Sequence, residues 1–440
     1  MKKIKCSFLG VLLIAVPILS KAAAVVPVTF DTKNGVPVYF VERNNLPIVD
    51  IAVIFSAGSV RDGSKWGIAN LTQQMMGHET QHYSEKEVSD RIAETGAILD
   101  SILTRDMSVW TLRSLSESKK LNRSTEVFHA ILTQPSFSKN IFLRLKDQTR
   151  VAILESEQDP MSLATNAFFE TMYRGQAYAH PRLGTLTSLA LLNEQDSLDF
   201  YTQYYTARNA SIILVGDLTP QQAKKLADTL SSGMLIGEAA PVIEPVIQQK
   251  KADVFVPLKK EQTTLVMGQL GFPPYSNYFY ARLVGNDIFG GAGLNSILAN
   301  EVRKKRGLAY FAYSQLTPLQ GDGPFVIASQ SREQNVKEVY RTIREAYHQF
   351  LNQNVSPERL EETKNSMIGG YKLANVTNTS LLLNLIPMVF YHFPLDYFQT
   401  FVQKIEAVTQ QDVLASFSTL KGKPLVTVMV GRTNAFEEKR

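Results

Sequence analysis

The pattern of apolar and polar positions predicts strands and helices that alternate along the first half of the chain. Val28–Phe30 and Val38–Val41 flank Asn34-Gly35, a pair of residues that favours a tight hairpin. Ile48–Phe55 alternates less cleanly and is mostly apolar, as in a strand buried on both faces. Further strands are predicted at Ile98–Leu103, Ser108–Leu112 and Ala210–Val215.

Helical spacing fills the intervals between these strands. In the segment 67–76, Ile68, Leu71 and Met75 recur roughly at the period of a helix. Ser84–Glu87 reads as a capping box, so a second helix is predicted to continue through residue 94 and to end at Gly96. Other helices are predicted at 117–133, 138–157, 197–205 and after the cap Thr219-Pro220.

A similar order of elements recurs in the second half. Strands are predicted at 262–270, 325–329 and 425–431, and helices at 277–289, 336–353, from 356 past 372, and at 395–417 with a break near Thr409. The Gly-, Pro- and Ala-rich stretch between the halves is typical of a linker. The pattern therefore predicts two homologous α+β domains from a tandem duplication, at 25–230 and 253–440, joined by the linker 231–252.

The first 24 residues have the pattern of a secretory signal peptide. A basic start precedes the apolar run 8–19, and small residues at 22–24 offer a cleavage site. The apolar run is short for a membrane-spanning helix, so we expect no stable membrane insertion after cleavage. A retained membrane anchor is the alternative.

Removal of this leader changes what the composition implies. The leader holds four lysines and no acidic residue, so the formal net charge falls from +5 to +1. No basic stripe then remains to indicate nucleic-acid binding. The single cysteine, Cys6, leaves with the leader. An exported protein of this size without disulfides fits the bacterial periplasm, which is the location we expect.

The candidate chemistry lies on the helical segment 67–76. Asn70, Gln73 and Gln74 stand at i, i+3 and i+4, so one helix face presents all three amides. The zinc motif H-x-x-E-H has this spacing, with two imidazoles as ligands and a glutamate as the general base. Amides are poor zinc ligands beside imidazole and have no basic site for a proton. The segment has the layout of a metallopeptidase site without its chemistry.

A second candidate follows at once, because His78-Glu79-Thr80-Gln81-His82 is a literal H-E-x-x-H motif. In that motif His78 and His82 would bind zinc and Glu79 would act as the base. The two histidines converge only if a helix runs through them, whereas Gly77 precedes the motif and the capping box at Ser84 follows it. We therefore expect a loop with solvated histidines, and a zinc site here remains the alternative.

Several motifs resemble those of the pitrilysin/insulinase family of zinc metallopeptidases, especially its short bacterial members and mitochondrial processing peptidase. The context of 67–76, with Thr80 and Ser84–Glu87 after it, is similar to the zinc-binding region of the family. Glu155 stands where the family has its third zinc ligand, although it cannot hold zinc alone. Tyr178–Thr185 is similar to a family stretch near the end of the first half. The resemblance covers essentially the whole chain after the leader.

Two motifs in the second half extend the resemblance. The segment 289–296 is similar to the glycine-rich loop of the family, which implies substrate contact. The segment 301–310 matches the family signature Arg…Gly-Leu-Ala-Tyr almost letter for letter. The residues that correspond to the loop and to the signature are Gly290, Gly291, Gly293 and Asn295, and Arg303 and Tyr310.

The resemblance implies a division of labour between two subunits. In active relatives, the residues matching Arg303 and Tyr310 hydrogen-bond the scissile carbonyl and its developing oxyanion. Here that pair is present, while the zinc ligands are not. We therefore expect a subunit that holds no zinc itself and pairs with a homologous zinc-bearing subunit to cleave extended or unfolded peptides. The alternatives are a homodimeric scaffold that binds peptides and a self-sufficient enzyme that uses His78 and His82.

Overall fold

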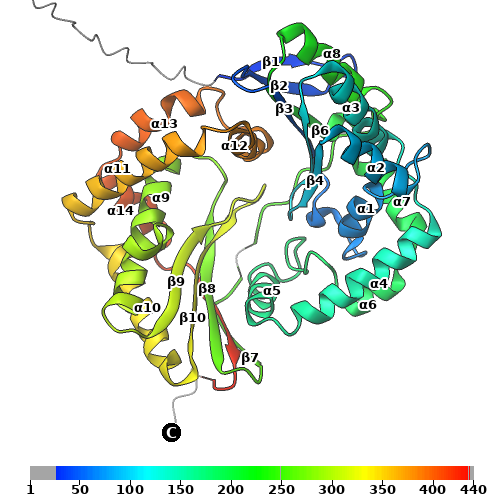
Figure 1. Cartoon of the computed structure of the whole chain (residues 1–440). Helices are drawn as coiled ribbons and strands as arrows, with labels where there is room; N and C mark the ends of the chain where they lie inside the picture. The colour runs from blue at the N-terminus through cyan, green and yellow to red at the C-terminus, as the bar shows by residue number, and fades with distance from the viewer. Residues whose placement is uncertain (1–25, 248, 435, 437–440) are drawn as a thin grey trace, which may run out of the picture.

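Two α+β halves make up the protein, seen in a computed structural model that describes residues 26–247, 249–434 and 436 (Figure 1). Each half contains one mixed sheet with helices around it, which confirms the predicted fold class. The signal peptide predicted at residues 1–24 lies outside the described residues.

The N-terminal half runs from the first described residue to about residue 231. Its strands are β1 (Val28–Asp31), β2 (Pro37–Glu42), β3 (Ile48–Phe55), β4 (Ile98–Leu103), β5 (Ser108–Leu115) and β6 (Ala210–Gly216). Its helices are α1 (Ile68–Met76), α2 (Glu85–Thr95), α3 (Ser118–Thr133), α4 (Lys139–Ser156), α5 (Pro160–Met172), α6 (Leu186–Leu191), α7 (Glu194–Tyr204) and α8 (Pro220–Ser231). The strands form one sheet in the order β1-β2-β6-β3-β5-β4.

The C-terminal half begins at residue 252. Its strands are β7 (Ala252–Pro257), β8 (Gln262–Phe272), β9 (Ala309–Leu316), β10 (Gly323–Arg332) and β11 (Val426–Gly431). Its helices are α9 (Phe279–Asn286), α10 (Val336–Asn352), α11 (Pro357–Ala374), α12 (Asn378–Phe390), α13 (Tyr397–Glu406) and α14 (Gln410–Ser418), with π-helical segments at Asp287–Gly291 and Ala299–Lys304. The sheet order is β7-β11-β8-β10-β9.

The two sheets share one topology. In each, the first long strand pairs in parallel with the last strand of the half, β2 with β6 and β7 with β11. The remaining pairings are antiparallel and follow the same sequence, with β3, β5 and β4 matching β8, β10 and β9. This correspondence is what a tandem duplication produces.

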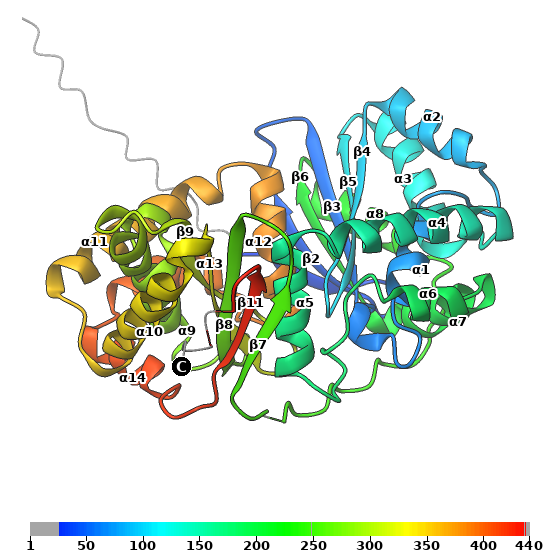
Figure 2. The ribbon, with the colours of Figure 1, turned by 90° about the horizontal axis from the view of Figure 1, so that it is seen from below.

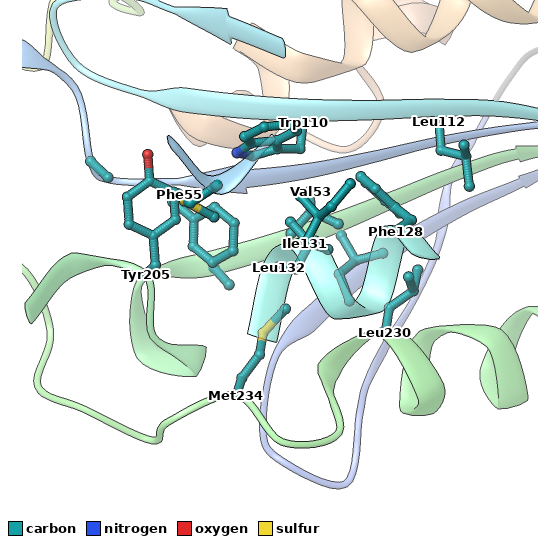
Figure 3. Close-up of a cluster of buried hydrophobic side chains, with 14 of the residues drawn as sticks. Val53, Phe55, Trp110, Leu112, Phe128, Ile131, Leu132, Tyr205, Leu230 and Met234 are labelled. Carbon is teal, nitrogen blue, oxygen red and sulfur yellow. The ribbon is translucent and has the colours of Figure 1, made fainter. Parts of the chain in front are cut away.

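One face of the N-terminal sheet packs against the helices of its own half. Figure 3 shows part of this core, where Phe55 and Trp110 of the sheet lie near Tyr205. The ring centroids of Phe55 and Tyr205 are 4.9 Å apart, and the Tyr205 hydroxyl donates a hydrogen bond to Ser108. Phe128 and Ile131 of α3 are fully buried in the same cluster, so this face is dry.

The other face of each sheet is covered by a helix from the opposite half. Helix α12, from the C-terminal half, packs on β3 and β6, and helix α5, from the N-terminal half, packs on β8 and β11 (Figure 1, Figure 2). Leu385 of α12 and Phe168 of α5 are both fully buried at these contacts. A Cβ on Gly268 would lie 2.8 Å from the Phe168 ring, so the glycine lets the helix approach the strand.

A buried carboxylate joins the halves beside these helices. Asp106 is 1% exposed and accepts hydrogen bonds from the hydroxyls of Tyr178 and Tyr391 and from the Gln320 backbone N–H, at 2.6, 3.0 and 2.8 Å. Burial raises its pKa, and the three donors partly offset that effect. Because two of the donors belong to the C-terminal half, this carboxylate fixes the halves relative to each other.

Most local predictions are confirmed. Ser84 forms the predicted capping box with Glu87, and Gly96 ends α2 with a positive φ. Thr409 caps α14 at the predicted break. Strand β3 is buried at seven of its eight positions, as expected for a strand covered on both faces.

Other elements were not predicted from the sequence. Helices α5 and α12 are buried on several sides, which weakens their helical periodicity, and α12 also contains Pro387. Strand β9 was not predicted within the signature motif either. The β1–β2 connection is a five-residue loop, since Asp31 pairs with Pro37, and not a tight two-residue turn.

Among the described residues, no single helix has the length and apolarity needed to cross a membrane. One bent pair, α11 with α12 at 113°, meets those criteria by length and composition.

We expect Leu385→Ala to lower the free energy of unfolding by about 2–5 kcal/mol, because it leaves a cavity against the N-terminal sheet. Both tryptophans, Trp66 and Trp110, lie in the N-terminal half, whereas Leu385 belongs to the C-terminal half. Tryptophan fluorescence during urea unfolding should therefore show the lower midpoint. A tryptophan transition that stays in place would mean that the halves unfold independently.

Candidate functional site

Helix α1 places the three amides on its surface facing the sheet and α4. Asn70 is 8% and Gln73 is 5% exposed. The Gln73 side-chain amide donates to the Ser108 hydroxyl at 2.8 Å and to the Ile102 carbonyl at 3.1 Å. The Gln74 amide donates to the Asn70 side-chain oxygen at 3.2 Å. These hydrogen bonds join Gln73 to the sheet and Gln74 to Asn70.

These side chains do not fit a zinc ion. The group consists of amides and a hydroxyl, without imidazole, thiolate or carboxylate among its members. Asn70 Oδ1 and the Gln73 amide are already engaged, while the Asn70 side-chain nitrogen is buried without a hydrogen-bond partner. Within the described ranges, no group of three histidine, cysteine, aspartate or glutamate residues is placed to hold a metal.

A buried contact between an aspartate and a histidine holds the start of α1. Asp62 accepts hydrogen bonds from the backbone N–H groups of Gly67 and Ala69 at 2.7 and 3.0 Å. His180 lies 3.0 Å from the same carboxylate, 4% exposed, and stacks on Trp66. Burial raises the pKa of Asp62, which His180 and the two amides partly offset. The stretch around His180 therefore has a structural function here: it anchors the helix that carries the amides.

Glu155 lies on the helix next to α1. It stands near the end of α4, which packs against α1, and its side chain is exposed. Its carboxylate has no hydrogen-bond or ion-pair partner within the described part of the chain. The structure thus places α4, which carries the predicted third zinc ligand, beside α1. Glu155 itself is a solvated carboxylate on α4.

The H-E-x-x-H segment is a loop between α1 and α2. Helix α1 ends at Met76, before the motif, and Thr80 forms an isolated β-bridge with Pro135. His78 Nδ1 lies 2.7 Å from Glu85, which also binds Arg144. His82 is exposed. Without a helix through the motif, the i, i+4 geometry that brings two imidazoles to one metal is missing.

Arg303 and Tyr310 form an exposed pair on the C-terminal half. Arg303 belongs to the π-helical segment Ala299–Lys304, and Tyr310 to the edge strand β9, where it is 75% exposed. Gly307, with φ +62°, turns the chain between them, so the Arg303 guanidinium lies 5.6 Å from the centre of the Tyr310 ring. Among the described residues, neither the guanidinium nor the hydroxyl has a hydrogen-bond partner. Both groups are free to donate outward.

Two basic residues close to Arg303 in sequence form ion pairs with a carboxylate. Glu301 binds Lys305 and Arg306 at 2.6 and 2.7 Å, which lowers the pKa of its carboxyl. This ion-pair cluster leaves Arg303 as the guanidinium directed at Tyr310. Of the four basic residues of the signature motif, Lys305 and Arg306 thus bind Glu301, whereas Arg303 stacks on Tyr310.

The segment predicted as a glycine-rich loop is helical and packs against strand β9: Gly290 and Gly291 end the π-helical segment Asp287–Gly291, and Gly293–Asn295 forms a 3-10 turn. A Cβ on Gly290 would lie 2.2 Å from the Ser314 backbone nitrogen, so only glycine allows this contact. Gly291 is similarly close to Asn286, and Gly293 has φ +56°. Asn295 is exposed, and its carbonyl accepts a hydrogen bond from Arg359 at 3.0 Å. Close neighbouring atoms at Gly290 and Gly291 and the positive φ of Gly293 explain why glycine stands at these positions. Substrate contact at this segment stays a prediction.

The site residues lie on two different halves. Helix α1 belongs to the N-terminal half and β9 to the C-terminal half, well apart in both views (Figure 1, Figure 2). The fold and the two motifs define a metallopeptidase-like α+β protein in which α1 carries three amides. A family model described as insulinase (peptidase family M16) matches residues 38–186, and one described as the peptidase M16 inactive domain matches residues 192–367. The chain belongs to the M16, or insulinase, family of peptidases.

Known proteins agree with this assignment. The crystal structure of a peptidase M16 inactive domain from Pseudomonas fluorescens is 30% identical, with a TM-score of 0.90 over 93% of this chain and 98% of that one. A protein of Helicobacter pylori named non-peptidase homolog YmxG is 23% identical over 366 residues, 81% of this chain and 82% of that protein. An uncharacterized zinc protease of Rickettsia felis is 25% identical over 318 residues, 71% of this chain and 75% of that protein.

Sequence reasoning missed the polar groups that hold the site in place. Asp62 and Asp106 are far in sequence from their partners His180 and Tyr391, so no local pattern connects them. No capping pattern reveals Asp62 either, because it stands five residues before Gly67, the residue at the start of the helix.

We expect the combined change Asn70→His, Gln73→Glu and Gln74→His to give a chain that binds about one zinc, because it restores two imidazoles on α1 beside Glu155. Zinc per chain, measured by elemental analysis after purification without chelator, is the readout.

Glu155→Gln in that background is the matched control and should lower the zinc content. A zinc-free triple variant would show that α1 and α4 do not converge on one site. Zinc in the unaltered chain that is lost on His78→Ala would instead assign the metal to the loop.

Proposed function

We propose that this protein is a catalytically incomplete M16 subunit that pairs with a zinc-bearing homologue to form a periplasmic metalloendopeptidase. Its Arg303 and Tyr310 would complete the active site of the partner. The observation that carries the proposal is the contrast between an exposed donor pair and a zinc helix made of amides. The partner would supply the metal, the base and the activated water.

The geometry of the donor pair supports this role. A guanidinium and a phenol that are both exposed and lack internal partners can donate to a carbonyl of a bound peptide. Such donors stabilise the charge that develops on the carbonyl oxygen when water attacks. Because α1 carries no base, that donation is useful only beside another active centre.

The substrate in this proposal is an extended or unfolded peptide. Tyr310 lies on β9, which is an edge strand of its sheet, so its outer backbone groups can pair with an extended chain. Strand pairing would present the peptide carbonyls in a regular row beside Arg303. The names of two relatives, a non-peptidase homolog and an inactive domain, are in line with an incomplete subunit.

The homodimeric peptide-binding scaffold remains a second candidate. The same exposed edge supports it, since strand pairing requires no catalysis. Co-purification distinguishes the two functions. If the proposed pairing is correct, a zinc-bearing M16 homologue should co-purify with this chain at equal stoichiometry. If the protein is a homodimeric scaffold, only a second copy of this chain should be present. For a self-sufficient zinc enzyme, the loop geometry of His78 and His82 gives no support.

We expect Tyr310→Phe to lower the kcat of the assembled pair by on the order of 10²–10³-fold, because one donor to the oxyanion is lost. The KM for a peptide substrate should change little, since the ring remains. Steady-state hydrolysis of a quenched fluorescent peptide by the reconstituted pair gives both constants.

Tyr313→Phe is the matched control, because Tyr313 lies on the same strand but is partly buried against the core, whereas Tyr310 is exposed. The loss of the Tyr313 hydroxyl should leave kcat unchanged. Equal activity of the Tyr310→Phe pair and the unaltered pair would refute the role of Tyr310.

A further inference from the structure

A small apolar cavity lies within the C-terminal half, apart from the donor pair. Its volume is about 220 Å³, and it lies between the end of β8, α9, the β9–β10 loop and the end of α12. Phe272, Phe279 and Phe393 and several prolines form its walls. An engineered apolar cavity of roughly 150 Å³ is enough to hold benzene, so this one has room for a single side chain and a small polar group.

One charged residue, Arg282, stands among the described residues that line this cavity. It is 9% exposed, and its guanidinium stacks on the Phe272 ring at 3.7 Å. Within the described residues, the only hydrogen bond of its side chain goes to the Ser276 hydroxyl, and its Nε is buried without a partner. Burial lowers the pKa of Arg282 to about 10, so the group still carries its charge at neutral pH.

The charges around Arg282 do not neutralise it. Asp322 lies near enough to raise its pKa but does not form an ion pair with it within the described chain. Lys423 is a second cation nearby. Burial and the charge of Arg282 lower its pKa. A buried cation without an anion is costly unless a ligand supplies one.

Arg105 shows what a purely structural arginine looks like in this protein. It is equally buried, at 9%, and stacks on Phe169 at 3.8 Å. Its guanidinium, however, donates to two main-chain carbonyls, those of Tyr178 and His180, at 3.1 and 2.7 Å. Arg282 has the same burial and stacking but lacks those acceptors, which leaves donors for a ligand.

The cavity opens beside a larger cleft. Thr317, Pro318, Pro387 and Tyr391 line both the cavity and a cleft of about 710 Å³ between the two halves. Polar side chains such as Asn166 contribute to the lining of that cleft. The cavity and the cleft are therefore neighbours that share one wall.

We propose that the cavity binds the C-terminal residue of a peptide, with an aromatic or large aliphatic side chain among the phenylalanines and the terminal carboxylate on Arg282. The rest of the peptide would lie in the cleft. The site needs no partner subunit, so it can be tested on this chain alone and its failure would leave the proposed pairing untouched.

The test is calorimetric titration of the purified chain with acetyl-Ala-Ala-Ala-Phe as the free acid and as the amide. We expect the acid to bind about ten- to a hundredfold more tightly, because a charge-assisted hydrogen bond to Arg282 is lost in the amide. Acetyl-Ala-Ala-Ala-Ala should bind more weakly than the phenylalanine peptide, since it leaves the cavity unfilled.

Two variants assign the effect. Arg282→Met should abolish the preference for the acid, whereas Arg344→Met, which removes an exposed arginine stacked on Tyr340, should keep it. If Arg282 serves a ligand, its replacement by an apolar side chain should leave the Tm unchanged or higher. Arg105→Met should lower the Tm, because two buried carbonyls lose their donor.

Several results would overturn the proposal. These are equal binding of acid and amide, an acid preference that survives Arg282→Met, and no binding of either peptide. Binding of 3-phenylpropionate as tight as that of the peptide would show a site for free acids instead. A Tm loss in Arg282→Met with unchanged peptide binding would identify Arg282 as a structural residue.

Discussion

The packing of α5 and α12 onto the sheet of the opposite half is the interaction on which the rest of the structure depends. Each sheet is buried on both faces only because a helix that belongs to the other half covers one of them. Without α12, residues such as Ile54 and Ile213 would face water, and burial of such side chains contributes roughly 1.5–3 kcal/mol each. The Asp106 network then fixes the orientation that this packing allows.

This arrangement explains why the two motifs cannot serve one another within the chain. Helix α1 lies on the outer face of the N-terminal sheet and β9 at the edge of the C-terminal one, and the interface holds them in place. Because a packed interface of this kind does not deform continuously, the Arg303–Tyr310 pair on β9 stays away from α1. The amides of α1 have structural contacts, since Gln73 binds Ser108 and Gln74 binds Asn70.

Local signals predicted much of the fold, since caps, turn glycines and buried strands depend on residues a few positions apart. The capping box at Ser84 and the break at Thr409 are examples. The layout of the amide helix and the exposed Arg303–Tyr310 pair were likewise readable from spacing and motif. The exchanged helices were not, because a helix buried on several sides lacks the one-sided apolar stripe that reveals it. The Asp62–His180 pair joins residues 118 apart, which no local pattern connects.

The exchange of helices also bears on how such a chain could arise. A single half, before duplication, would have carried one sheet with an uncovered apolar face and one helix without a sheet to cover. In a dimer of that half, the helix of each copy would cover the apolar sheet face of the other copy across a two-fold axis, as in a domain-swapped dimer. The present chain then corresponds to such a dimer made continuous by the segment 232–251, after which each copy was free to keep or lose its own motif.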